Sequence, residues 1–147
     1  MISKSKSVNL FCVAGLTMLA LSACGAQSAA DACNVVNKAG AKLLPEIGSA
    51  IEDTSSDPSG TLKRFQTAAA DFKTGTASIG NPQVKEAKDL MLSNLDKMIT
   101  SITEVEAAGK AGKSQDELHV MVLKKLQPLA NTFQNDWNTK LAAACGG

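Results

Sequence analysis

Aromatic side chains are scarce in this chain, which has no tyrosine, one tryptophan and four phenylalanines among its 147 residues. No charge of either sign dominates, since 15 basic residues stand against 14 acidic ones. Proteins that bind nucleic acids usually carry a basic excess, and those that bind single strands add aromatic side chains on which the bases stack. Because this chain has neither feature, we expect no nucleic-acid partner.

Ligands for a metal or haem are equally scarce, because His119 is the only histidine. Di-iron bundles need a carboxylate-x-x-His motif on two helices plus further carboxylates, and Asp116-x-x-His119 supplies only one such motif. A haem held by His119 and by Met91 or Met98 is the other option, but both methionines fit the packed side of a helix. We therefore expect a solvent-exposed His119, no cofactor and no metal site.

The motifs of common enzymes are missing as well. The sequence holds no serine-nucleophile elbow, no glycine-rich phosphate loop and no clustered carboxylate pair. The acidic stretch 52–57 lacks the alternating ligands and the distant glutamate of a calcium-binding EF-hand loop, so we interpret it as a capped, solvent-exposed turn. The sequence predicts that the protein has no catalytic residues and is not an enzyme.

The first 24 residues have the pattern of an export signal. Two lysines precede an apolar run, residues 8–20, which is shorter than the ~20 residues of a membrane-spanning helix. A cleavage site of small residues follows. At that site the sequence Leu21-Ser22-Ala23-Cys24 matches all four positions of the lipobox. Residues 1–24 therefore resemble the signal peptides of bacterial lipoproteins.

The resemblance implies that residues 1–23 are cleaved, and that Cys24 is diacylated on sulfur and becomes the new N-terminus. The protein would then be exported and anchored to the bacterial cell membrane, since two or three acyl chains give stable attachment. The residue after Cys24 is Gly25 and not the aspartate that retains lipoproteins in the inner membrane of Gram-negative bacteria. In a Gram-negative source the protein could therefore also be anchored to the outer membrane. The alternatives are an ordinary signal peptide with a chance cysteine, or a buried helix of the domain.

Two cysteines remain once Cys12 is cleaved off and Cys24 is lipidated, and they stand at opposite ends of the mature domain. In an exported protein an even number of remaining cysteines favours a disulfide, whereas a metal or redox pair needs close spacing such as Cys-x-x-Cys. We therefore predict a disulfide between Cys33 and Cys145.

Apolar residues recur at helical spacing in four segments, whereas alternation typical of strands is rare. The expected helices run over residues 31–53, from Asp57-Pro58 to Gly80, from Asn81-Pro82 to Gly109, and from Ser114 to Cys145. A cap residue followed by proline is typical of a helix start, and Ser114 with Glu117 fits a capping box. We expect Pro45 to kink or split the first helix and Pro128 to bend the fourth.

Each expected helix is apolar along one stripe only, so none is stable alone and all four must share a core. The stripes are Val36, Ala39, Leu43, Ile47 and Ala50; Leu62, Phe65, Ala69, Phe72, Thr76 and Ile79; Val84, Met91, Leu95, Met98, Ile102 and Val105; and Leu118, Val122, Leu126, Leu129, Phe133, Trp137 and Leu141. Short connections favour antiparallel neighbours, so we predict an all-α, up-down-up-down four-helix bundle over residues 31–147. That topology puts Cys33 and Cys145 at the same end.

Residues 24–30 are expected to form a short lipidated tether. From Cys24 to Cys33 the extended chain reaches about 30 Å, so the end of the bundle that holds the disulfide should lie close to the membrane. We expect a non-catalytic binding or scaffolding role toward another envelope protein or a cell-wall component. The alternatives are a carrier of a small apolar ligand, held between helices near the alanine runs 68–70 and 142–144, and an enzyme that depends on a metal or haem at His119.

Overall fold

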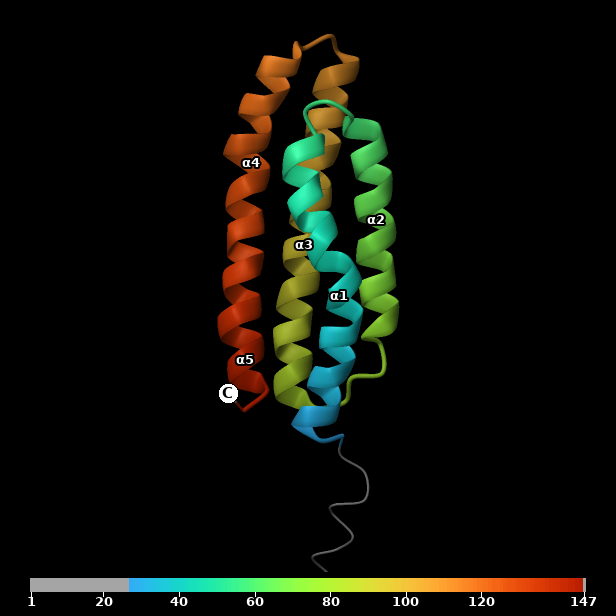
Figure 1. The fold of residues 1–147 in the computed structure, drawn as a ribbon, viewed down its shortest axis with the longest axis vertical. Coiled ribbons are helices and arrows are strands. Elements are labelled where there is room, and N and C mark those ends of the chain that lie inside the picture. The colour runs from blue at the N-terminus through green and yellow to red at the C-terminus, as the bar shows by residue number, and fades with distance from the viewer. Residues whose placement is uncertain (1–26, 147) are drawn as a thin grey trace, which may run out of the picture.

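The computed structural model describes residues 27–146, and all regular secondary structure within that range is helical. Four long helices lie side by side (Figure 1): α1 (Ala29–Asp53), α2 (Pro58–Gly75), α3 (Pro82–Lys110) and α4 (Gln115–Asp136). The chain continues from α4 through a π-helical turn, η1 (Trp137–Leu141), into the short α5 (Ala142–Ala144). The prediction of an all-α helical bundle is confirmed. None of the described helices combines the length and the apolar character that a membrane span requires.

The two ends of the bundle differ in what they carry. The α1–α2 and α3–α4 connections lie at one end, which we call the distal end (residues 52–62 and 104–118) (Figure 1). The other end, which we call the disulfide end, holds residues 27–37, 74–84 and 139–146. There Cys33 and Cys145 form a disulfide with their Cα atoms 5.9 Å apart, as predicted. Along the bundle α1 packs mainly against α2, and α3 packs mainly against α4.

Side-chain caps set the starts of the helices. The backbone N–H of Gly60 donates to Asp57 at 2.9 Å, and that of Val84 donates to Asn81 at 3.2 Å. Ser114 and Glu117 form the reciprocal capping box, which satisfies two backbone donors that a helix start leaves free. The three predicted starts are thus confirmed. The first helix begins at Ala29, two residues before the expected position, because Ser28 caps it.

The end of α2 differs from the prediction. The helix ends at Gly75 rather than at Gly80, and Thr76 follows as its C-cap. The Thr76 hydroxyl donates to the carbonyl of Phe72 at 2.7 Å, which satisfies a group that the helix end leaves free. Beyond it Ile79 is 5% exposed, so the connection folds back onto the core. The connection therefore covers residues 76–81 and is longer than the two or three residues expected.

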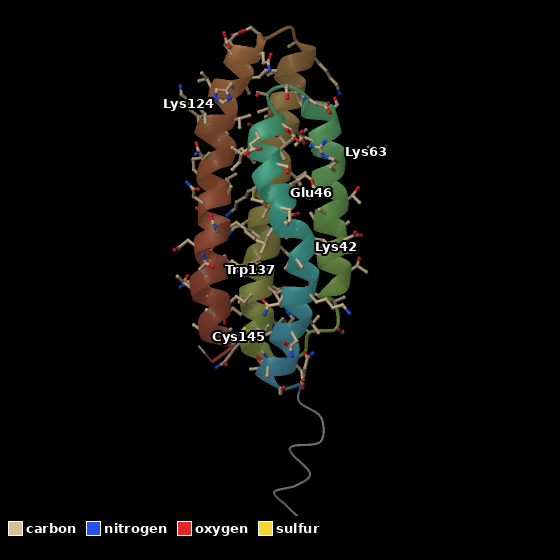
Figure 2. All side chains as sticks on the ribbon, in the orientation of Figure 1. Lys42, Glu46, Lys63, Lys124, Trp137 and Cys145 are labelled. Atoms are coloured by element: carbon tan, nitrogen blue, oxygen red, sulfur yellow. A yellow bond between two sulfur atoms is a disulfide. The ribbon has the colours of Figure 1, made fainter. Side chains whose placement is uncertain are left out.

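Neither proline splits its helix. Pro45 lies within the continuous α1 and Pro128 within the continuous α4, and both are exposed. A π-helical turn, η1, follows α4 and begins at the half-buried Trp137. Its ring centroid lies 6.3 Å from that of Phe72 and 6.0 Å from that of Phe133. Figure 2 places Trp137 nearer the disulfide end than the distal end.

The predicted apolar stripes form one shared core. Every member of the stripe on α3 is at most 1% exposed. Phe65, Phe72 and Phe133 are the largest fully buried side chains. On α4 Leu129 packs against the core but is only partly buried, and Ala130, which the predicted stripe did not include, is buried at 3% exposure. The other stripe members that are only partly buried are Ala39, Leu62 and Trp137.

Candidate functional site

The predicted lipidation site, Cys24, and the signal segment 1–23 lie outside the described residues. Three residues after Cys24, Gln27 is attached to the α2–α3 connection. The backbone N–H of Gly80 donates to Oε1 of Gln27 at 2.8 Å, and Nδ2 of Asn81 donates to the carbonyl oxygen of Gln27 at 3.4 Å. We call these two bonds the Gln27 clasp. Sequence reasoning missed it, because its partners are 53 and 54 residues apart and follow no local pattern.

The disulfide lies partly within the core. Cys33 is 5% exposed and belongs to the core cluster, and Cys145 is partly buried against it. The bond joins the second turn of α1 to the residue that follows α5, so it ties the two ends of the described chain together. The separation of the two Cα atoms lies in the usual range for disulfides. Figure 2 shows Cys145 at the same end as the start of α1.

Charged residues are distributed unevenly along the bundle. Within the disulfide end the only charged residues are Asp31 and Lys140. The distal end carries seven acidic and two basic residues, namely Glu52, Asp53, Asp57, Glu104, Glu106, Asp116 and Glu117 with Lys110 and Lys113. Apart from the partly buried Asp53 and Glu106, all of them are exposed. The two ends therefore offer very different surfaces to a partner.

A groove of about 400 Å³ opens at the distal end. Its lining residues come from both connections and the helix ends beside them: Ser55, Ser56, Pro58, Ser59, Glu106, Gly109, Lys110, Lys113, Gln115 and Leu118. Across the groove the hydroxyl of Ser59 donates to Oε1 of Glu106 at 2.6 Å, and Nζ of Lys110 pairs with the same oxygen at 2.9 Å. The hydrogen bond from Ser59, followed by that from Lys110, lowers the pKa of the Glu106 carboxyl. Glu106 is thus held in its ionised form at the edge of the groove.

Three further acidic groups of the distal end, those of Asp53, Asp57 and Glu117, have local partners. Nη2 of Arg64 donates to Asp53 at 2.6 Å, and Asp57 caps α2. The expectation that residues 52–57 form a solvent-exposed turn is wrong in part, because Thr54 is 0% and Ser55 is 9% exposed. Glu117 accepts from Nζ of Lys113 at 2.9 Å and from the backbone and hydroxyl of Ser114. These bonds, the one from Lys113 first, lower the pKa of the Glu117 carboxyl from 4.5 to about 2.

The residues weighed as metal or haem ligands lie in different environments. Asp116 and His119 are exposed on the first turns of α4, whereas Met91 and Met98 are 0% exposed within the core. Both methionines therefore pack against other apolar side chains. Within residues 27–146 no three histidine, cysteine or carboxylate side chains come together as a metal-binding group.

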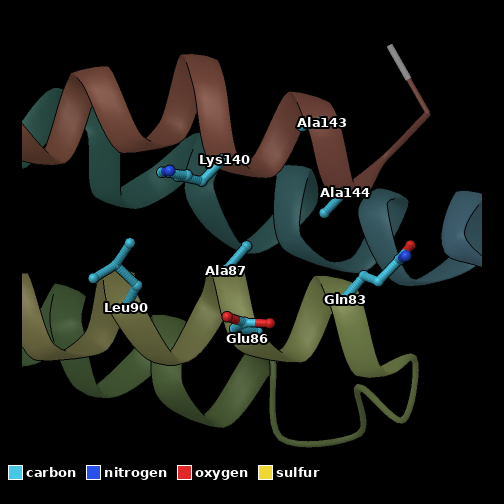
Figure 3. A pocket seen from close by; sticks show the side chains of 7 residues that line it. All are labelled: Gln83, Glu86, Ala87, Leu90, Lys140, Ala143 and Ala144. Atoms are coloured by element: carbon cyan, nitrogen blue, oxygen red, sulfur yellow. The ribbon is translucent and has the colours of Figure 1, made fainter.

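The two alanine runs considered for an apolar ligand differ. In the run 68–70, Ala69 packs into the core. The run 142–144 borders a surface groove of about 600 Å³ between α3 and the end of the chain (Figure 3). Its lining residues are Gln83, Glu86, Ala87, Leu90, Lys140, Ala143 and Ala144. Leu90 is 38% exposed there, and it is one of four exposed large apolar side chains among the described residues.

Buried polar groups form a further feature that the apolar pattern did not indicate. Nδ2 of Asn94 donates to Oδ2 of Asp136 at 2.8 Å, and this pair between α3 and α4 is buried. Thr61 is 1% exposed, and its hydroxyl has no hydrogen-bond partner among the described residues. Thr61 and Asn94 each directly precede a residue of a predicted stripe, Leu62 and Leu95, but neither was part of a stripe and the sequence did not indicate that they are buried.

Comparisons with protein-family models, with curated proteins and with solved structures found no match to this chain. A functional proposal must therefore come from the residues and geometry described above.

Proposed function

We propose that this protein is a lipoprotein of the bacterial cell envelope, anchored through Cys24, which binds another envelope protein or a cell-wall component without catalysing a reaction. The observation that carries the proposal is the concentration of charged and hydrogen-bonding groups around a groove at the distal end. The lipobox match at residues 21–24 supports the anchor. The start of the described chain at the opposite end supports the orientation, because the anchor then lies far from the groove.

We further propose that the helices form an up-down-up-down four-helix bundle. In support, the connections alternate between the two ends in Figure 1, and the disulfide joins the first and last helical segments. This topology presents the two distal connections side by side, so that one partner can touch both. It also leaves the tether and the chain end together on the membrane side.

The distal groove suits a polar partner with some apolar surface. Exposed ion pairs contribute little affinity in water, so binding has to come from groups that lose water inside the groove. Pro58 and Leu118 supply apolar lining, while Ser55, Ser56 and Lys113 supply donors. Gly109 also lines the groove, and a Cβ atom there would make ordinary van der Waals contact with Leu118 at 3.4 Å and with Pro58 at 3.8 Å. The acidic excess of this end favours a partner with basic groups.

Site-specific photocrosslinking in intact cells tests the partner. A photoreactive amino acid replaces Gln115, which lines the groove, or Gln66, an exposed glutamine in the middle of α2 as the matched control. We expect a discrete adduct of higher mass from position 115 and none from position 66. The double substitution Glu52→Lys, Asp116→Lys reverses two exposed acidic charges of the distal end and should weaken that adduct. Equal adducts from both positions, or none from position 115, would overturn the assignment of the distal groove.

Metabolic labelling with an alkyne fatty acid tests the anchor. Cys24→Ser should abolish labelling and processing by the lipoprotein pathway, because Cys24 is the only cysteine in the lipobox. Cys12→Ser is the matched control and should be labelled like the unchanged protein, since Cys12 lies in the segment expected to be cleaved. Persistent label in Cys24→Ser would refute the lipid anchor.

A second candidate function is the transport of a small apolar ligand. The observation that favours it is the groove in Figure 3, where Ala87, Leu90 and Ala143 form an apolar lining next to the Lys140 side chain. Native mass spectrometry of protein purified from its own host tests this function. A bound mass that is lost in Ala87→Glu would support a carrier, and a ligand-free spectrum would remove the candidate.

A further inference from the structure

We propose that the disulfide end is itself a lipid-contact surface, which rests on the headgroups of the membrane and holds the bundle upright. The proposal depends on the lipid anchor at Cys24 proposed above. The folded domain itself would then contact the membrane, in addition to the acyl chains on Cys24. Two independent observations carry it: the short chain between Cys24 and the folded domain, and the near absence of charge at this end.

The attachment is shorter than the sequence indicated. α1 begins at Ala29 with Ser28 as its N-cap, so helical structure starts five residues after Cys24. The Gln27 clasp fixes the residue before that cap to the α2–α3 connection. Three residue steps of fully extended chain span about 10 Å. Once Cys24 lies at the membrane surface, the disulfide end can therefore lie no further than about 10 Å from it.

The clasp also restricts the direction of the bundle. Asn81 accepts from the backbone N–H of Val84 through Oδ1, and its Nδ2 points to the carbonyl of Gln27. One side chain thus caps α3 and holds the incoming chain, so the position of Gln27 is tied to the start of α3. Only two residues, Gly25 and Ala26, separate Cys24 from this fixed point, which limits how far the bundle can tilt.

The disulfide end, which this geometry turns toward the membrane, has a surface that is compatible with contact to lipid headgroups. Most of its exposed residues are small and uncharged, among them Ala30, Ala77, Gly80 and Ala143. Of its two charged residues, Asp31 already accepts a hydrogen bond from the Ser28 hydroxyl at 2.7 Å. Moving a charge out of water is costly unless it is paired. Bringing the disulfide end, with its two charged residues, to the membrane therefore costs less free energy than bringing the distal end, with its nine.

An upright bundle has a direct consequence for the distal groove. α3 has 29 residues, and a helix rises about 1.5 Å per residue, so the bundle is about 40 Å long. The distal groove would then face away from the membrane at roughly that height. A partner in the wall or in a neighbouring layer could reach it without touching the lipid.

Fluorescence quenching on vesicles tests this orientation. The full chain is produced in a bacterium, and mass spectrometry establishes whether Cys24 carries acyl groups. The acylated protein is reconstituted into vesicles of phosphatidylglycerol and phosphatidylcholine that contain a headgroup spin-labelled lipid. A fluorophore is attached at Ala77→Cys at the disulfide end, or at Gln115→Cys at the distal end. We expect quenching several-fold stronger at position 77 than at position 115. Similar quenching at both positions, or none at position 77, would overturn the proposal.

Two changes to the attachment provide the matched comparisons. Gln27→Ala should weaken the contrast between positions 77 and 115, whereas Gln66→Ala should leave it unchanged. A flexible Gly-Ser linker of about ten residues after Gly25 adds about 18 Å of reach and should abolish the contrast. An undiminished contrast with the linker would overturn the role assigned to the short attachment. A missing acyl mass would refute the anchor itself, whereas an acylated protein without contrast would refute only the upright orientation.

Discussion

Gly40 of α1 lies directly against the ring of Trp137. A Cβ atom built on Gly40 would come 2.1 Å from Cη2 and 2.8 Å from Cζ2 of the indole, although glycine itself leaves room for the ring. Gly40 is buried, and Trp137 is the residue at which α4 passes into the π-helical η1. Single π-helical turns often accommodate a local packing need. We interpret η1 as a local change in helix geometry that allows the indole ring of Trp137 to pack against α1.

We expect Gly40→Ala to destabilise the protein by about 1–3 kcal/mol, because the added methyl group overpacks a filled site. Urea denaturation measures the change. Gly48→Ala is the matched control in the same helix, since a Cβ atom there meets nothing within 4 Å. The control should gain about 0.5–1 kcal/mol from the lower backbone entropy of the unfolded chain. A Gly40→Ala protein as stable as the control would contradict the packing described here.

Thr61→Val should stabilise the protein by about 1 kcal/mol, because a buried hydroxyl without a partner costs free energy that a methyl group avoids. Thr61 is 1% exposed, so the hydroxyl cannot recover a bond from bulk water. Thr67→Val is the control on the same helix, since the exposed Thr67 donates to the carbonyl of Lys63 at 2.9 Å. Chemical denaturation of both variants measures the difference. A loss of stability in Thr61→Val would show that the hydroxyl is satisfied in solution.

Glu117 should make the capping box of α4 sensitive to acid. The pKa of its carboxyl is lowered from 4.5 to about 2 in the folded protein, first by Lys113 and then by Ser114. A group with a depressed folded pKa stabilises the fold above its unfolded pKa, and that contribution disappears as the pH falls through the folded value. The contribution is thus complete above about pH 4.5 and lost toward pH 2.

Melting temperatures measured between those two pH values check this prediction. Glu117→Gln should melt earlier than the unchanged protein near neutral pH and should lose part of the acid dependence. Glu86→Gln, on an exposed face of α3, is the control and should follow the unchanged protein. Identical acid profiles for Glu117→Gln and the unchanged protein would contradict the depressed pKa.

The starts of the helices could be predicted because each depends on residues that are neighbours in sequence. Asp57, Asn81 and Ser114 bond to backbone groups three residues away, so the motif contains both partners. The end of α2 could not be predicted in this way. It depends on how Ile79 reaches the core and on how Gly75 approaches Ala39, where a Cβ atom would come within 3.2 Å. Those contacts are tertiary, and a glycine at position 80 was a misleading local signal.

The candidate site likewise contains one contact that could be predicted from the sequence and others that could not. The Cys33–Cys145 bond was predictable because cysteine pairing and the expected topology each pointed to it. The Gln27 clasp, the Asn94–Asp136 pair and the Gly40–Trp137 contact join residues that are 42 or more positions apart. Glutamine, asparagine and glycine occur in many exposed positions, so their presence in the sequence did not indicate these contacts.

The disulfide should be the main tie between the first and last helical segments. α1 packs mainly against α2, and α4 packs mainly against α3, so few contacts between α1 and α4 would hold these segments together without the bond. The bond closes a loop with a sequence separation of 112. Removing a native disulfide from a small exported domain typically costs about 2–5 kcal/mol. We expect a loss in that range for the double substitution Cys33→Ser, Cys145→Ser.

The double variant should keep its helical far-ultraviolet signal, because the core stripes of all four helices remain. It should melt earlier, and hydrogen exchange should speed up first at residues 31–34 and 141–144, where the chain ends depend on the bond. The unchanged protein under reducing conditions should behave in the same way, which separates loss of the bond from an effect of the serines. Free thiols at both positions in the native protein, or an unchanged melting temperature in the variant, would show that the two chain ends do not rely on this bond.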